Sequence, residues 1–253
     1  MKFFGDYHTH TKESDGKGSV LDNILSASKS GLEEVAIADH SFSTIACKMT
    51  RAKFDKQERE IADYYSSTEN PIKVLHSVEG NLLGFDGDID IPDDIIERVD
   101  ILHVGFHRFL NFSETAKNSK YVFVNGFGSG KAKEKIKELN TEAYLKALDK
   151  YPIDVLVHLG HRCPVDMRAI CKKAVEKDVY IELNEKHVET LEKDVSAIVE
   201  SGVKLIVGSD GHKPEKVGKF ERVAEFIKRH NIPEDRVYGL GQKPVFKNKK
   251  KGN

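Results

Sequence analysis

The sequence predicts a single-domain α/β fold in which seven βα units form a parallel barrel. Short apolar runs alternate with amphipathic stretches along the chain, which is typical of repeated strand–helix units. The length of 253 residues suits one such barrel, and no Pro- or Ser-rich linker divides the chain. We therefore expect one domain over residues 1–246 with an inserted loop at about 108–130, followed by a short basic tail over 247–253.

Seven short apolar runs are the expected strands, because each has the length of a buried strand and is too short for a helix. They are Phe3–Tyr7, Val35–Ala38, Lys73–Val78, Ile101–Phe106, Asp154–Val157, Val179–Leu183 and Leu205–Val207. The amphipathic stretches that follow them are the expected helices. These are Ser19–Ser30, Thr50–Ser66, Asp93–Arg98, Lys131–Leu148, Val165–Lys177, Val188–Ser201 and Glu215–Arg229.

Glycine and proline mark some of the helix ends. Gly31 and Gly202 follow two of the amphipathic stretches, where glycine commonly ends a helix. Pro164 is expected to open the helix over Val165–Lys177, since proline is favoured at the first helical position.

The segment Arg108–Gly130 interrupts this alternation. It contains NGFGSG at Asn125–Gly130 and is too long and glycine-rich for a simple βα connection, so we expect a flexible active-site loop. Its end has some likeness to a nucleotide-binding P-loop. The full G-x-x-x-x-G-K-[ST] pattern is absent, because Gly126 lies only four residues before Gly130 and Ala132 stands at the Ser/Thr position.

Composition excludes several classes of protein. The 40 Lys and Arg residues balance 41 Asp and Glu residues, so no global basic field holds long nucleic acid. No apolar run approaches the roughly 18 residues of a membrane span, and MKFFGDYHTH lacks the apolar stretch of a signal peptide. We expect a cytoplasmic protein. Cys47, Cys163 and Cys171 show no C-x-x-C spacing, which argues against a disulfide framework or a thiolate zinc site.

Histidines and carboxylates follow the ends of the predicted strands. His8 and His10 end the first strand two residues apart, so their imidazoles point to the same face and can bind one metal ion. Asp210 and His212 form a similar pair after the seventh strand. The other polar residues at such positions are Asp15, Asp39, His40, Glu79, His107, His158, His161 and Asn184.

The joint position of these residues predicts a polynuclear metal centre. Any one of them taken alone is equally well a cap or a hydrogen-bonded core group. In a parallel barrel, however, all strands end at one face, where such barrels carry their active sites. So many imidazoles and carboxylates crowded together need cations as partners, and nitrogen and carboxylate donors suit Zn²⁺, Mn²⁺ or Fe²⁺. Nine donors exceed one tetrahedral ion, which indicates two or three divalent ions with Glu79 bridging two of them.

Such a cluster lowers the pKa of a bridging water and neutralises the oxygens of a phosphoryl group. Hydrolysis is therefore the expected chemistry.

In order and spacing, these motifs resemble those of the polymerase-and-histidinol-phosphatase (PHP) family. The motifs are H-x-H-T with ESDG (His8–Gly16), ADH (Ala38–His40), VEGN (Val78–Asn81), GFH (Gly105–His107), VH-x-G (Val157–Gly160) and GSD-x-H (Gly208–His212). The resemblance is to the small stand-alone, histidinol-phosphatase-like members. It implies a distorted seven-stranded TIM-like (β/α)7 barrel with three metal ions.

The resemblance also implies how three ions are shared among nine ligands. One ion takes His8, His10, Glu79 and Asp210; a second takes Glu79, His107 and His158; a third takes Asp15, His40 and His212. Family members vary between Asp, His and Glu near Asp15. Of the nine, Glu79, Asp210 and His212 are the expected catalytic residues.

Neighbouring residues have other expected roles. Asp39 is expected to orient an imidazole, and His103 to be a hydrogen-bonded core residue. His161, His187 and Asn184 are expected to line the pocket, and His76 and His230 to be structural or surface residues.

Selection of a phosphate needs fixed cations in addition to metal ions. Arg108 directly follows His107, and Arg162 lies shortly after His158, so both leave the rim of the site. Lys186 and Asn184, after the sixth strand, complete the expected substrate-binding residues. The alternative for each cation is an ordinary surface charge.

We expect a metal-dependent phosphomonoesterase with a small phosphorylated substrate, and histidinol phosphate is a candidate by resemblance only. The nearest alternative is a phosphodiesterase or nuclease that uses the same site on nucleotides or nucleic-acid ends, against which the neutral charge and the lack of a basic aromatic strip weigh. A non-catalytic metal-binding module is a second alternative, and the intact ligand set weighs against it. Hydrolysis of C–N bonds is a third, since amidohydrolase barrels also carry H-x-H on their first strand, but no metal-bridging lysine is evident.

Overall fold

The computed structural model describes residues 1–45, 47–108, 121, 124–125 and 131–247. In this part of the chain eight strands form one sheet, and each pairs in parallel with the next along the sequence. The strands are β1 (Gly5–Thr9), β2 (Glu34–His40), β3 (Lys73–Asn81), β4 (Ile101–Gly105), β5 (Val155–Leu156), β6 (Tyr180–Asn184), β7 (Leu205–Gly208) and β8 (Val237–Tyr238).

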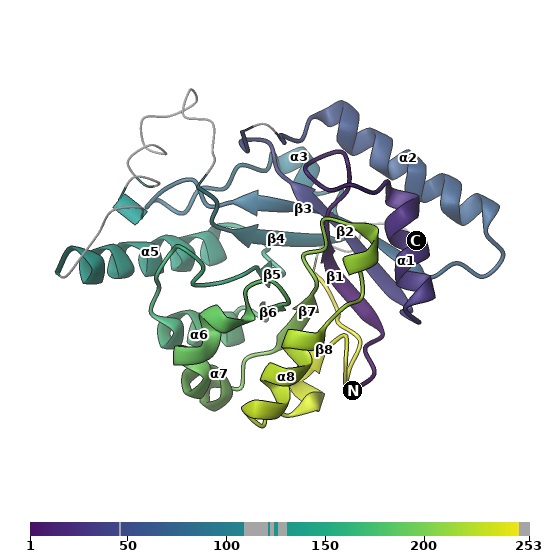
Figure 1. Ribbon diagram of the computed structural model, residues 1–253. Helices are drawn as coiled ribbons and strands as arrows, with labels where there is room; N and C mark the ends of the chain where they lie inside the picture. The colour runs from purple at the N-terminus through teal and green to yellow at the C-terminus, as the bar shows by residue number, and fades with distance from the viewer. Residues whose placement is uncertain (46, 109–120, 122–123, 126–130, 248–253) are drawn as a thin grey trace.

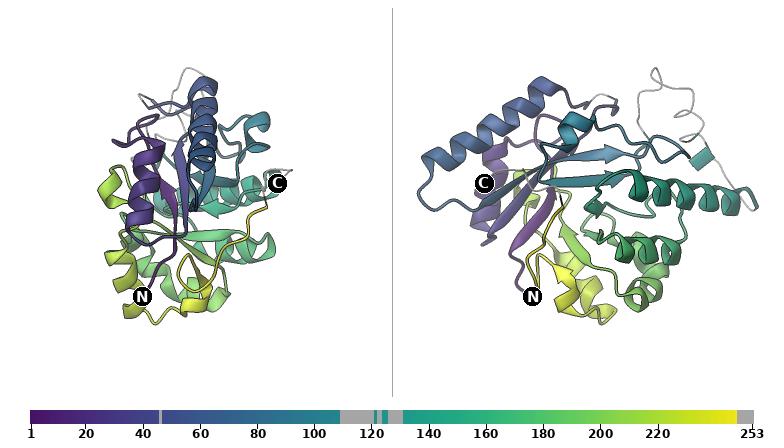
Figure 2. Two further views of the ribbon diagram at one scale, coloured as in Figure 1. Left: turned by 90° about the vertical axis from the view of Figure 1, so that its right-hand side faces the viewer. Right: turned by 180° about the vertical axis from the view of Figure 1, so that it is seen from behind.

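Helices lie on the outer side of the curled sheet (Figures 1 and 2). The α-helices are α1 (Val20–Lys29), α2 (Arg51–Ser67), α3 (Asp93–Ile96), α5 (Lys131–Lys150), α6 (Met167–Glu176), α7 (Val195–Ser201) and α8 (Glu221–Arg229). Within the described ranges the chain also forms three 3-10 helices, η1 (Val188–Asp194), η2 (Pro214–Lys216) and η3 (Glu234–Arg236). Among the described residues, no helix combines the length and apolar character needed to cross a bilayer.

The sheet curls until its first strand meets the residues after its seventh. The backbone N–H of Asp210 donates to the carbonyl oxygen of His8 at 2.8 Å, and that of His10 donates to Gly211 at 3.0 Å. Phe4, just before β1, similarly donates to Gly239 after β8 at 2.8 Å. This curvature brings residues at the carboxyl ends of β1 and β7 together, although some 200 residues separate them.

The single α/β domain of parallel βα units is confirmed, but the expected count of seven strands is wrong. The additional strand, β8, consists of two residues that follow a 3-10 helix, and no apolar run in the sequence predicts it. The strands with buried residues on both faces, such as β2, explain why the apolar runs are continuous rather than alternating.

Three helix predictions also need correction. Helix α6 begins at Met167 rather than after Pro164, because the Asp166 side chain accepts hydrogen bonds from the backbone N–H groups of Arg168 and Ala169 and caps the helix there. The stretch Val188–Ser201 divides into η1 and α7, and the stretch Glu215–Arg229 divides into η2 and α8, which begins only at Glu221. Gly31 and Gly202 do follow helix ends, with positive φ angles of 75° and 74°. Most of the expected loop at 108–130, and the tail from 248, lie outside the described residues.

Candidate metal centre

Glu79, near the end of β3, is the hub of the cluster of imidazoles. Its side chain is buried, with 1% of its surface exposed, and its Oε1 lies 2.7 Å from Nε2 of His158 and 3.3 Å from Nε2 of His107. Its Oε2 lies 2.8 Å from Nδ1 of His40. These contacts arise because β2, β3 and β4 run in register, with His40 beside Glu79 and Glu79 beside His103. One carboxylate thus faces imidazoles from three elements.

A second group joins the first strand to the segment after β7. Nε2 of His8 lies 3.1 Å from Nε2 of His10, and the latter lies 3.3 Å from Oδ1 of Asp210. Donor atoms of these three residues all lie within 4.8 Å of one another, and all three residues are buried. The H-x-H spacing on a strand produces this convergence, as the sequence predicted.

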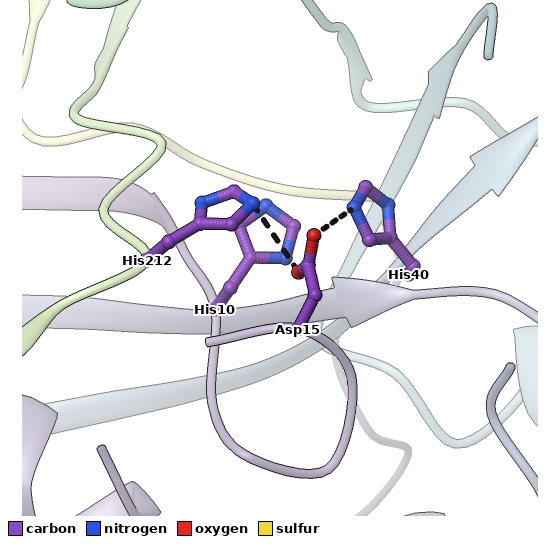
Figure 3. A group of neighbouring side chains, drawn as sticks. All are labelled: His10, Asp15, His40 and His212. Carbon is purple, nitrogen blue, oxygen red and sulfur yellow. Dashed lines mark ion pairs between the residues drawn. The ribbon is translucent and has the colours of Figure 1, made fainter. Parts of the chain in front are cut away.

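The third group is built around Asp15, on the loop after β1 (Figure 3). Its Oδ2 lies 3.5 Å from Nε2 of His40, and its Oδ1 lies 3.2 Å from Nε2 of His212. His10 completes this group, with all four donor atoms again within 4.8 Å. Figure 3 shows the Asp15 carboxylate between the rings of His40 and His212. Unlike Glu79, Asp15 is substantially exposed, with 42% of its side chain accessible.

The donor atoms fit divalent cations. Nδ1 of His40 and Oε2 of Glu79 are 2.8 Å apart, yet both are buried without a hydrogen bond of acceptable geometry. Buried polar atoms in proteins nearly always have a partner, so an unpaired imidazole and carboxylate side by side favour a shared cation. A set of imidazoles and carboxylates without thiolates suits zinc, manganese or iron.

Burial and neighbouring charges shift the pKa values of the metal-free groups in opposite directions. Burial lowers the pKa of His10 to about 3, which keeps this imidazole neutral and able to bind a metal. Burial by itself raises the pKa of the Glu79 carboxyl. The imidazoles of His107, His8 and His40 outweigh this effect and hold its pKa well below the usual value. For His8, burial is outweighed by the carboxylates of Glu182 and Glu79, which raise its pKa well above the usual value.

Glu182, in the middle of β6, is a site residue that the sequence analysis missed. Its Oε1 lies 2.7 Å from Nδ1 of His8, and its Oε2 accepts hydrogen bonds from the backbone N–H of His158 at 2.8 Å and from Nδ2 of Asn184 at 3.0 Å. It shares strand parity with Asn184, which is the signal that could have identified it. Glu182 therefore fixes the orientation of His8 and the backbone position of His158.

Other buried polar groups form hydrogen bonds with the candidate ligands or with their neighbours. Oδ1 of Asn81 lies 2.6 Å from Nδ1 of His107, and the Asn81 amide donates to Asp90 at 2.7 Å. Nδ1 of His103 lies 2.5 Å from the hydroxyl of Ser77, in agreement with the expected core role of His103.

Asp39 has a different role from the expected one. Its carboxylate accepts hydrogen bonds from the backbone and hydroxyl of Thr11, from Ser14 and from Gln57, and its nearest approach to the His10 imidazole is 3.9 Å. It thus anchors the loop that carries Asp15. No hydrogen bond joins Asp39 to an imidazole among the described residues, because donors of Thr11, Ser14 and Gln57 occupy its carboxylate, so the expectation that it orients an imidazole through such a bond is not met.

Strained backbone marks the same region. Outside glycine, the described residues with positive φ include His158 at 33°, Arg162 at 55° and Asp210 at 52°. Such conformations cost free energy in residues with a side chain and are concentrated at functional sites. Two of these three residues are candidate metal ligands, and the third lies at the pocket described next.

A pocket of ≈ 180 Å³ opens onto the candidate metal centre. Its wall includes the expected substrate-binding residues Arg108, Arg162 and Lys186, as well as His161 and His187. Nζ of Lys186 lies 3.0 Å from Oδ1 of Asp210 and 2.7 Å from Nδ1 of His212. The cations of the rim thus face the imidazole cluster across one small cavity.

Asn184 does not line this pocket among the described residues. Its amide nitrogen donates to Glu182 and to Asp210, and its oxygen accepts the backbone N–H groups of Lys186 and His187. Its polar atoms are therefore all engaged in positioning neighbours, which disagrees with the expectation that it binds substrate.

Known proteins resemble this chain over nearly its whole length. It is 27% identical over 262 residues to a probable phosphatase of Clostridium acetobutylicum, which covers 97% of this chain and 93% of the relative. It is 25% identical over 256 residues to a probable phosphatase of Shewanella piezotolerans, covering 94% and 89%. Among solved structures, the histidinol phosphate phosphatase of Lactococcus lactis, solved with zinc, L-histidinol and phosphate, shares the fold with a TM-score of 0.59, at 14% identity and covering 92% and 95% of the two chains. The PHP domain family model matches residues 6–233, and the chain therefore belongs to the PHP domain family.

Proposed function

We propose that this protein hydrolyses a small phosphomonoester with the help of two or three divalent metal ions. The observation that carries the proposal is the Glu79 carboxylate, which has imidazole nitrogens of five histidines within 3.7 Å: His8, His10, His40, His107 and His158. A buried anion surrounded in this way is suited to bridge two cations. The probable phosphatases that resemble the chain, and the zinc in the Lactococcus lactis structure, support the same interpretation.

Three ligand sets account for the contacts around the centre. His8, His10 and Asp210 would hold one ion, with Glu79 as the bridge to a second that also takes His107 and His158. Asp15, His40 and His212 would hold a third. His40 faces both Glu79 and Asp15, through Nδ1 and Nε2, so its ring connects the second and third sets.

Divalent ions at such a site supply an acidified water nucleophile and neutralise the negative charge that the phosphoryl group develops. The chain itself supplies orientation and charge. Arg108 and Arg162 offer planar donor pairs that match phosphate oxygens. Lys186 is held by Asp210 and His212 at the edge of the pocket, where its ammonium can donate to a phosphoryl oxygen. Glu79, Asp210 and His212 would act in catalysis by fixing the cations relative to the substrate.

The test combines metal analysis with a panel of substrates. The purified protein is stripped with a chelator, reloaded with Zn²⁺, Mn²⁺ or Fe²⁺, and assayed with p-nitrophenyl phosphate, bis-p-nitrophenyl phosphate and a cyclic amide. We expect two to three ions per chain and turnover of the monoester in preference to the other two. Preference for the diester would favour the phosphodiesterase alternative, and failure of every metal to support phosphate release would refute the proposal.

A further inference from the structure

A second pocket adjoins the first and is strongly cationic. It has a volume of ≈ 320 Å³, and four basic side chains but no carboxylate contribute to its described wall: Arg108, Lys133, Arg162 and Lys193. Arg108 and Arg162 line both pockets, so the two cavities are neighbours that share these two side chains.

Three consecutive connections of the barrel bring these cations together. Arg108 follows β4, and Lys133 lies in the first turn of α5, where the chain returns from the same connection. Arg162 lies between β5 and α6, with the positive φ of 55° noted above. Lys193 lies in η1, after β6. The charges converge through folding, since the four residues come from separate segments of the sequence, and only Lys133 lies in a lysine-rich stretch, KAKEKIK over 131–137.

Within the residues that the structure describes, these four cations have few partners of opposite charge. There, Arg108 donates to the backbone oxygen of Asn125 at 3.4 Å, and its Nε is buried without a hydrogen-bond partner. Lys193 approaches Asp194 at 4.0 Å, and within the described part of the chain Arg162 and Lys133 form no ion pair. Elsewhere the basic residues are commonly paired: Arg98, for example, contacts both Asp55 and Glu58 at 2.5 Å.

Four like charges around one cavity repel one another unless an anion lies between them. In a chain of net charge -1, this concentration is local and lies beside the proposed reaction centre. The unpaired Nε of Arg108 also indicates an anionic ligand, because a buried guanidinium donor ordinarily has an acceptor. An anionic ligand group would supply both the charge and the acceptor.

We propose that the substrate carries a second anionic group, a phosphate or a carboxylate, on its leaving group, and that the second pocket binds it. This inference rests on the proposed phosphatase function: the ester phosphate occupies the metal centre while Arg108 and Arg162 lie between the two anionic groups. A leaving group with an ammonium, such as histidinol, would instead face four cations. The proposed substrate class is therefore a phosphate monoester that carries a carboxylate or a second phosphate in addition to the ester phosphate.

The test uses phosphate monoesters of the form phosphate–O–(CH₂)n–X, in which n runs from two to five and X is ammonium, hydroxyl, carboxylate or phosphate. At the best chain length, we expect kcat/KM to be at least roughly tenfold higher for an anionic X than for hydroxyl, and lowest for ammonium. Comparison of the carboxylate and phosphate members identifies which anion the pocket prefers. Because the pocket attracts charge, the preference should shrink as ionic strength rises.

The double variant Lys133→Glu/Lys193→Glu reverses two of the four charges. Both lysines are exposed, so the fold should tolerate the change, and a thermal melt checks this. We expect the ratio of kcat/KM between anionic and ammonium X to fall by roughly tenfold or more. The matched control Lys2→Glu/Lys29→Glu makes the same change in net charge at two exposed positions that do not line the second pocket. This control should retain the wild-type ratio.

Binding to the metal-free protein provides a readout that does not depend on turnover. In titration calorimetry, 3-phosphonopropionate should bind more tightly than 3-aminopropylphosphonate, and the Lys133→Glu/Lys193→Glu variant should remove the difference. If the esters are hydrolysed with equal kcat/KM for all X, the proposal of a second anionic group is wrong, but the proposed phosphatase function is retained. Hydrolysis of none of the esters, with the calorimetric preference intact, would overturn the phosphatase function instead.

Discussion

The carboxylate of Glu182 and the imidazole of His8 form a buried pair, with Oε1 2.7 Å from Nδ1, across 174 residues of sequence. This contact fixes the Nδ1–H tautomer of His8 and leaves Nε2 free to bind a metal. The second oxygen of Glu182 holds the backbone N–H of His158 at 2.8 Å. One carboxylate therefore supports candidate ligands from two strands.

Substitution Glu182→Gln should weaken metal binding by roughly 10- to 100-fold. The amide keeps the size of the side chain but replaces one acceptor by an N–H group, which then faces either the His8 ring N–H or the His158 backbone N–H. Zinc affinity measured by competition with a chromophoric chelator checks this. The control Glu176→Gln, at an exposed position on α6, should bind zinc as the wild type does. Unchanged affinity in Glu182→Gln would show that this contact does not orient a ligand.

Metal binding should release protons near neutral pH. In the metal-free protein, burial opposes protonation of His8 and His40, but nearby carboxylates raise the pKa of both well above the usual value. These imidazoles therefore hold protons at pH 7 that an incoming cation must displace. It follows that metal affinity rises with pH through the neutral range and falls as the solution is acidified.

Titration calorimetry in two buffers of different ionisation enthalpy measures this release. The apparent binding enthalpy should depend on the buffer, by an amount that corresponds to at least about one proton per chain. The same enthalpy in both buffers would show that the ligands are already deprotonated.

The substitutions Asp15→Asn and Glu79→Gln should differ in metal content. Asp15 lies on an exposed loop and contacts only the His40 and His212 side of the centre, so Asp15→Asn should lose about one ion per chain. Glu79 contacts imidazoles from several strands, so Glu79→Gln should lose most of the bound metal and reduce kcat/KM by roughly 100-fold or more. Elemental analysis of dialysed protein gives the counts. Equal metal content in the two variants would contradict the bridging role of Glu79.

Gly208→Ala should disturb the metal centre through steric overlap. A Cβ atom at Gly208 would overlap Oε1 of Glu182 and lie 2.7 Å from Cβ of His8. Overpacking of this kind costs about 1–3 kcal/mol of unfolding free energy, and displacement of Glu182 should also weaken zinc binding. Urea denaturation and the chelator competition measure the two effects. The matched control Gly84→Ala has its nearest neighbouring atom, Oδ1 of Asp86, at 3.4 Å and should change neither.

The clustering of the candidate ligands was predictable because it combines a local pattern with a topological rule. His8, His40, Glu79 and His107 each follow or end an apolar run, and parallel strands bring such positions to one face. Strand β8, which follows η3, carries no comparable signal, because its two residues are too few to establish a period. The strand count consequently required the structure.

The residues around the ligands were less accessible to sequence reasoning. Glu182 lies inside an apolar strand and belongs to no motif, and its role in the site depends on its distance to His8 on another strand of the curled sheet. Asp39 stands beside a ligand in the sequence, yet its carboxylate is taken by Thr11, Ser14 and Gln57. In both cases hydrogen-bond partners come from segments whose relative position no periodicity determines.

The sequence by itself therefore determined the family, the parallel α/β architecture and the set of residues that converge at the strand ends, because strand parity and strand direction are local properties. Only the tertiary structure decided which imidazoles surround Glu79, which carboxylate supports His8, and that Arg108, Lys133, Arg162 and Lys193 line one cavity. These features depend on the curvature of the sheet and on the packing of separate connections, which are set by the whole fold.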